Sequence, residues 1–183
     1  MSQQDNDLIA EIFDALKQKF DVEYTELQDF EPTQFSSFNQ YNKVGVVKKI
    51  AIKRAGTGYL SFIKTPTTLL QLWGSVKINK DFGHVLIRPE KFADKLQELI
   101  KPVEIDFPDD KLFSQMNYVV ANDRQKAVAA VTSGFRNIVA ELQEDEFVIE
   151  IINDQLIINI KREPSPEVAK KLYKFIVAAA LLH

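Results

Sequence analysis

The stretch FVIEIINDQLIINIK, residues 147–161, decides the fold, because its apolar pattern predicts a β-hairpin in one register. A two-residue turn at Asn153-Asp154 suits a tight hairpin, since both residues adopt positive φ readily. That turn places six apolar side chains on one face, in the pairs Phe147–Ile160, Ile149–Ile158 and Ile151–Leu156. The opposite face receives Glu150, Asn159 and Lys161. A shift of one residue would break this match, so the pattern and the turn predict the same antiparallel pairing.

The hairpin is followed by a predicted C-terminal helix. Ser165 is a favourable N-cap and Pro166 suits the first helical position. Its expected buried stripe consists of Val168, Leu172, Phe175, Ile176 and Ala179. After Lys174 the helix is apolar on every side, so it requires cover all round, either from its own chain or from a second copy. For the second case the predicted dimer contact consists of Phe175, Ala178, Ala179 and Leu182.

Upstream of the hairpin, strands and helices follow one another with short connections. Hydrophobic periodicity predicts helices over 5–20, 89–100 and 127–142, the last with a break at Ser133-Gly134. It predicts strands over 44–54, 59–63, 69–78, 85–87, 103–107 and 116–120. This order favours an α+β fold: a mostly antiparallel sheet with helices chiefly on one face and amphipathic helices at both termini.

Residues 21–42 have no clear periodicity and contain aromatic residues among polar ones. We therefore expect residues 1–42 to form an N-terminal helix with a connecting segment. The α+β domain then spans 43–183, with the whole chain as one folding unit.

Charge is sorted into blocks along the chain. The net charge is −7 over residues 1–40, +8 over 41–101 and −6 over 102–161. The basic hairpin at 43–64 carries Lys48, Lys49, Lys53 and Arg54, which suggests binding of a polyanion such as nucleic acid or acidic lipid. A sequence pI of about 5.5 weighs against nucleic-acid binding. Acidic and basic elements that fold against each other explain the same pattern.

The composition excludes several classes of site. The chain has no cysteine, which rules out disulfides, thiolate zinc sites, iron–sulfur clusters and a cysteine nucleophile. The start of the chain is acidic and polar, unlike a signal peptide. The longest uncharged apolar run, Phe175–Leu182, is far shorter than the roughly 20 residues of a membrane span. We expect a cytoplasmic protein with no cofactor and no membrane span.

Candidate groups for chemistry are few. His84 lies three residues after Asp81, but a metal site needs three or four ligands, so a turn histidine is the favoured interpretation. Asp106, Asp109 and Asp110 are the densest acidic cluster and, with His84, would be the parts of a carboxylate-dependent hydrolase. Gly56-Thr57-Gly58 lacks the remainder of any nucleotide motif and indicates a hairpin turn. No metal-binding or catalytic residue is predicted.

Part of the chain resembles a known family. The features are Phe113, the strand Tyr118-Val119-Val120-Ala121-Asn122-Asp123, the helix to Leu142 and the hairpin. Over residues 107–161 these resemble an uncharacterised bacterial domain family of unknown function. The resemblance implies no activity and no site residues.

Three functions follow from these observations. The favoured hypothesis is a non-enzymatic protein-interaction module that homodimerises or binds another protein. Polyanion binding through the basic hairpin is the first alternative. The carboxylate-dependent hydrolase is the second alternative.

Overall fold

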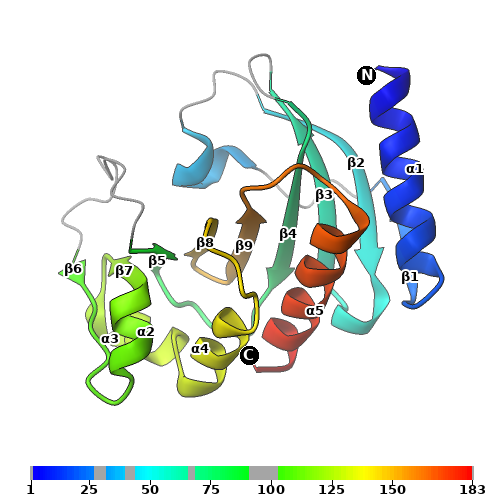
Figure 1. Ribbon diagram of the computed structural model, residues 1–183. Helices are drawn as coiled ribbons and strands as arrows, with labels where there is room; N and C mark the ends of the chain where they lie inside the picture. The colour runs from blue at the N-terminus through cyan, green and yellow to red at the C-terminus, as the bar shows by residue number, and fades with distance from the viewer. Residues whose placement is uncertain (1, 27–31, 40–43, 66–68, 91–102, 183) are drawn as a thin grey trace.

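A computed structural model describes residues 2–26, 32–39, 44–65, 69–90 and 103–182 of the chain. The described residues form one antiparallel sheet of nine strands in the order β1-β2-β3-β4-β9-β8-β5-β7-β6, with five α-helices (Figure 1). The strands are β1 (Val22–Thr25), β2 (Gly45–Ile52), β3 (Gly58–Lys64), β4 (Gln71–Lys77), β5 (His84–Pro89), β6 (Val103–Glu104), β7 (Asn117–Ala121), β8 (Phe147–Ile152) and β9 (Gln155–Ile160). The predicted α+β class is confirmed.

The helices cover one face of the sheet. They are α1 (Gln3–Lys17), α2 (Lys111–Met116), α3 (Arg124–Ala130), α4 (Ser133–Ala140) and α5 (Pro166–Leu182). Helix α5 packs on β3, β4 and β9, with α1 and α4 beside it (Figure 1). The main hydrophobic core lies between these helices and the sheet.

The predicted hairpin is confirmed in its register. Strands β8 and β9 pair as Phe147 with Ile160, Ile149 with Ile158 and Ile151 with Leu156. Asn153 in the turn has a φ of 56°, as a tight turn requires. The hairpin lies in the middle of the sheet, where β9 pairs with β4 and β8 pairs with β5.

The opposite face of the sheet is partly covered by the 32–38 segment, which consists of two 3-10 turns, η1 (Pro32–Gln34) and η2 (Ser36–Phe38). Phe35 and Phe38 are buried against three residues of this face: Ile63, Trp73 and Ile157. The Phe38 and Trp73 ring centroids are 4.3 Å apart. Phe35 and Phe38 therefore hold the 32–38 segment against the sheet, although this segment was expected to be irregular.

Several local predictions need correction. The expected irregular segment 21–42 contains β1, which pairs with β2. Pro89 does not start a helix, because it is paired with Asn117 in the β5–β7 ladder. The remainder of that predicted helix falls on residues 91–102, outside the described residues. Helix α2 was not predicted, since its six residues are too few to show a period.

The division of the chain at residue 42 stays a prediction, because residues 40–43 lie outside the described residues. Helix α1 contacts α5, and the Lys64 ammonium on β3 lies 2.7 Å from the Asp5 carboxylate on α1. The first helix is therefore attached to the sheet and to the last helix.

Candidate functional site

The face of the sheet opposite the helices carries unusual polar side chains at buried positions. The buried polar residues of this face are Lys49, Ser61, Ser75, Glu150 and Asn159. The strand register aligns Tyr59, Ser75, Ile157 and Glu150 side by side across β3, β4, β9 and β8. A buried polar group is costly unless it is hydrogen-bonded, so each one requires an explanation.

Glu150 is the centre of this face. Its side chain is 0% exposed. Its Oε1 atom accepts hydrogen bonds from the Ser36 amide at 2.9 Å and the Ser36 hydroxyl at 2.7 Å. Its Oε2 atom accepts from the Ser37 amide at 2.9 Å and the Ser37 hydroxyl at 2.6 Å. The His84 Nε2 atom lies 2.6 Å from Oε1 and donates to the ionised carboxylate.

These contacts determine the charge state of Glu150. Burial raises the pKa of its carboxyl, whereas the hydrogen bonds from His84, Ser37 and Ser36 lower it. The hydrogen bonds together outweigh burial, so the pKa of Glu150 lies below its ordinary value. The side chain is therefore a stable anion that accepts five donors.

The arrangement joins the 32–38 segment to the sheet. A serine nucleophile requires a base that accepts its hydroxyl proton, usually a histidine. Here the hydroxyls of Ser36 and Ser37 donate to the carboxylate, and the imidazole of His84 faces that same carboxylate. The Glu150 cluster thus acts as an anchor for the segment. The Gln34 amide adds a second attachment by donating to Gln155 Oε1 at 2.6 Å.

Beside the anchored segment, two pockets meet at the ends of β3, β4 and β9. The smaller pocket, about 260 Å³, is lined by Thr57, Tyr59, Ser75, Val76, Lys77, Gln155 and Leu156. The larger pocket, about 580 Å³, is lined by Thr57, Lys77, Ile78, Asn79, Lys80, Asp81, Asn153 and Asp154. Since Thr57 and Lys77 line both pockets, the two are neighbouring parts of one groove.

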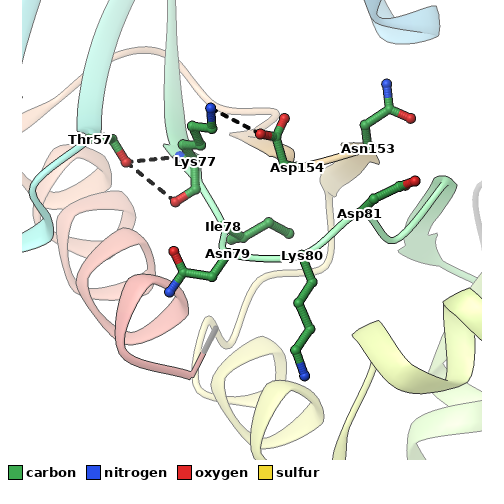
Figure 2. A pocket seen from close by; sticks show the side chains of 8 residues that line it. All are labelled: Thr57, Lys77, Ile78, Asn79, Lys80, Asp81, Asn153 and Asp154. Carbon is green, nitrogen blue, oxygen red and sulfur yellow. Dashed lines mark hydrogen bonds and ion pairs between the residues drawn. The ribbon is translucent and has the colours of Figure 1, made fainter.

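Three of the four charged residues that line the groove, Lys77, Asp81 and Asp154, form ion pairs. Figure 2 shows the Lys77 ammonium reaching Asp154, and the two groups are 3.1 Å apart. The Asp81 carboxylate lies 2.7 Å from the Lys126 ammonium. The hydrogen bonds from Lys126 and from the Gly83 amide lower the pKa of Asp81. Lys80 points away from the other labelled side chains (Figure 2). The Thr57 hydroxyl donates to the Lys77 carbonyl and accepts from the Lys77 amide, two positions beyond the last pair of the β3–β4 ladder.

The four residues of the predicted polyanion site do not share one surface. Lys48 is exposed and lies over the Tyr24 ring, on the side of α1. Lys49 is only 5% exposed and lies on the opposite face, over the Tyr59 ring. The geometry gives no support to polyanion binding through a single surface.

The other two cations of the hairpin follow β2 in a 3-10 turn, η3 (Lys53–Ala55). Lys53 lies 3.0 Å from Glu23 on β1 and 3.7 Å from Asp21, and these two acidic partners raise its pKa. Arg54 is exposed. The ion pair between Lys53 and Glu23 fits the expectation that acidic and basic elements fold against each other.

The predicted dimer contact falls largely inside the chain. Phe175 and Ala179 are buried, and the Phe175 ring packs edge-on against Phe135 of α4. Ala178 is half-buried. Only Leu182 of the four is exposed, so homodimerisation through this set stays a prediction.

The acidic cluster and His84 lie apart. Asp109 and Asp110 both bind the buried Arg136 guanidinium on α4, and Asp110 also caps α2. Asp106 is exposed. His84 lies at the Ala121 end of β7, whereas α2, which follows Asp110, leads into the Asn117 end. The structure does not bring together the parts of the predicted hydrolase.

Among the described residues, no group of three or more histidine and acidic side chains could hold a metal ion. Within the same ranges, no helix is long and apolar enough to cross a membrane. No pattern in the sequence indicated Ser36, Ser37 and Ser75 as site residues, and the alternation that placed Glu150 on the polar face did not indicate its burial. The available signal was the alternating pattern that places Glu150 and Asn159 on the same face of the hairpin.

No family model matches the chain, and no curated protein matches it. The chain is similar to one solved structure, the crystal structure of the mycobacterial trehalose monomycolate transport factor A, TtfA. The TM-score is 0.63, with 10% sequence identity, over 96% of this chain and 93% of the other. At this identity the likeness shows a shared fold alone. The resemblance over residues 107–161 stays a prediction.

Proposed function

We propose that the chain is a non-enzymatic interaction module that binds a protein partner through one end of its helical layer. The observation that carries this proposal is the position of its exposed apolar side chains. In the described residues, five of the nine large exposed hydrophobic side chains belong to α2, α3 and the end of α5: Leu112, Met116, Val128, Leu181 and Leu182. Exposed apolar side chains on neighbouring elements are typical of protein–protein interfaces.

The elements that carry these residues are held together. Arg136 on α4 binds the N-cap of α2, and α4 packs against α5. The Leu182 side chain approaches Gly134 at the start of α4. We call this region, α2 to α4 with the last turn of α5, the helical end (Figure 1).

Two further observations support binding rather than catalysis. Glu150, the most buried carboxylate of the polar face, has both oxygens occupied by hydrogen-bond donors that hold a chain segment. The fold is also shared with a protein named as a transport factor. A second copy of the chain is the first partner to test, since Leu182 was part of the predicted dimer contact.

Site-specific photo-crosslinking tests the proposal. A benzophenone amino acid replaces Leu181 or Leu112 at the helical end, and the variants are irradiated in the native host. Leu69 is the matched control, because it is a similarly exposed leucine before β4. We expect a discrete protein adduct from positions 181 and 112 and none from position 69.

The mass of the adduct identifies the partner. An adduct of two chains indicates a homodimer. Light scattering of the purified protein then checks the dimer. The double variant Leu181→Lys with Leu182→Lys should be a monomer in the same measurement. An adduct with another protein supports a heterologous partner. The absence of any adduct from both helical-end positions would overturn the proposal.

A further inference from the structure

The connection between β1 and β2 is long for two neighbouring strands. The strands pair antiparallel, with Thr25 opposite Lys49, an arrangement that a hairpin loop of roughly 2–5 residues can join. Residues 26–44 connect them instead. Within this connection the 32–38 segment reaches Glu150 on β8, although four strands separate β8 from β1. Long connections of this kind usually carry a function.

The 32–38 segment is held on the sheet by side chains. It is not a strand of the sheet, and its 3-10 turns form backbone hydrogen bonds within the segment. The amides and hydroxyls of Ser36 and Ser37 donate to one side chain, the Glu150 carboxylate. The segment can therefore leave the sheet while the strand ladder stays intact, which favours a local opening below the free energy of global unfolding.

Beneath the segment lies an apolar cluster that is separate from the main core. Phe35 and Phe38 pack there on Ile63, Trp73 and Ile157, which belong to the adjacent strands β3, β4 and β9. The main core lies on the other face of the sheet, so opening of the segment leaves it intact. Opening uncovers an apolar patch on three strands, and exposed patches of this kind are typical of interaction sites.

Opening also changes the surroundings of Glu150. Its carboxylate is 0% exposed in the closed state, where Ser36 and Ser37 provide an amide and a hydroxyl each. When the segment leaves, water replaces these donors, so the carboxylate regains hydration as it loses hydrogen bonds. The net cost of opening is therefore smaller than the number of hydrogen bonds suggests. The His84 imidazole, 2.6 Å from the same carboxylate, remains beside it on β5.

The covered face selects one kind of peptide. It accepts aromatic side chains at two positions three residues apart, and Glu150 requires N–H or O–H donors from the residues between them. The chain itself supplies this pattern as Phe35-Ser36-Ser37-Phe38. A partner with an aromatic residue, two hydroxyl residues and a second aromatic residue presents the same groups.

We propose that the 32–38 segment is an autoinhibitory cover, which opens while the sheet stays folded and exposes a second binding face on Ile63, Trp73 and Ile157. The partner of that face is a peptide segment with two aromatic residues three positions apart and serine or threonine between them. In the closed state the chain's own segment competes with this peptide for Glu150 and for the apolar cluster. The face lies opposite the helices, so its binding is independent of the helical end.

Hydrogen exchange of the wild-type chain tests the opening. The amides of Ser36, Ser37 and Phe38 should exchange as one group, at least about tenfold faster than amides of the β8–β9 ladder, because their opening does not require global unfolding. Small additions of denaturant should leave their rate nearly unchanged, since a local opening exposes little surface. Exchange of these amides at the rate of the ladder, with the same dependence on denaturant, would overturn the proposal.

A peptide that copies residues 32–39 tests the binding face. Trp73 is the only tryptophan of the chain, and its ring centroid is 4.3 Å from that of Phe38, so its fluorescence reports on this face. In the double variant Phe35→Ala with Phe38→Ala the cover is weakened, and the peptide should bind with a saturable change in fluorescence. The wild type should bind it at least about tenfold more weakly, because its own segment competes at a high effective concentration.

Two controls accompany the titration. A peptide with both phenylalanines replaced by alanine should not bind. The variant Phe20→Ala, which removes a ring stacked on Tyr173 on the helical side, should behave like the wild type. Circular dichroism verifies the fold of each variant, and Ser36→Ala with Ser37→Ala takes the place of the phenylalanine variant if the latter does not fold. The proposal is overturned if a folded cover variant does not bind the peptide, or if the wild type binds it with equal affinity.

Discussion

Single residues on the polar face determine how the 32–38 segment lies on the sheet. Glu150 belongs to β8, yet its partners Ser36 and Ser37 are more than a hundred positions earlier in the chain. Each oxygen of the carboxylate accepts an amide and a hydroxyl, and one also accepts from His84. A buried carboxylate with this many donors stabilises one geometry, because any other side chain leaves donors without an acceptor.

Glu150→Gln is expected to lower the free energy of unfolding by about 2–4 kcal/mol. The substitution replaces one acceptor oxygen with an NH₂ group, which then faces the N–H and O–H donors of one serine. Chemical denaturation of the variant and the wild type measures the difference. Glu146→Gln, an exposed change on the residue before β8, is the control and should be nearly neutral. Equal losses in the two variants would contradict the role assigned to Glu150.

At the scale of elements, α1 is fastened by an ion pair as well as by apolar packing. The Lys64 ammonium on β3, together with the Ser2 amide, lowers the pKa of Asp5 from 3.8 to about 2. Ser2 and Asp5 also form the capping box of α1. One carboxylate therefore caps a helix and connects it to the sheet.

This pKa shift gives a testable pH dependence. A carboxylate with a lowered pKa in the folded state stabilises the protein above its ordinary pKa, and this contribution is lost as the pH falls. The stability difference between the wild type and Asp5→Asn should be constant above about pH 4, shrink between about pH 4 and 2, and vanish below. Asp7→Asn in the same helical turn is the control. A difference that persists unchanged to pH 2 would contradict the prediction.

Elements with a local pattern could be predicted from the sequence, and those held by distant partners could not. The β8–β9 hairpin was correct to the residue pair because its alternation and its Asn153-Asp154 turn specify the same register. Strand β1 was missed, since four residues carry no clear period and the strand depends on pairing with β2. The burial of Glu150 depends on the 32–38 segment, which local periodicity cannot reveal.

The same distinction applies to the candidate site. The basic hairpin is a real cluster in the sequence, but adjacent residues of a strand point to opposite faces. Lys48 and Lys49 consequently lie on different sides of β2. The helix after Lys174 was expected to require cover on every side. In the structure its cover comes mainly from α4 and the sheet.

At the scale of the whole molecule, the sheet is assembled from both ends of the chain. Strands β1 to β4 form one half, and β5, β7 and β6 form the other. The hairpin β8–β9 lies between β4 and β5 and joins the two halves. Helix α5, which follows the hairpin, then covers the joined region on the helical side.

Fragments divided before the hairpin should show this dependence. Residues 1–146 alone should lack a cooperative unfolding transition, because β4 and β5 lose their shared neighbours. Mixing with residues 147–183 should restore it, as measured by circular dichroism during thermal unfolding. Ile158→Lys in the shorter fragment, at a buried position, should prevent the recovery. A cooperative transition in residues 1–146 alone would contradict this view.

The central position of the hairpin also has a consequence for biosynthesis. A ribosome makes the chain from its N-terminus, so β4 and β5 emerge long before their neighbours β9 and β8. During that interval both strands present open edges of unpaired amides and carbonyls, which are templates for aggregation. Completion of the sheet must therefore wait until residue 160 has left the exit tunnel, and until then the edges of β4 and β5 stay open.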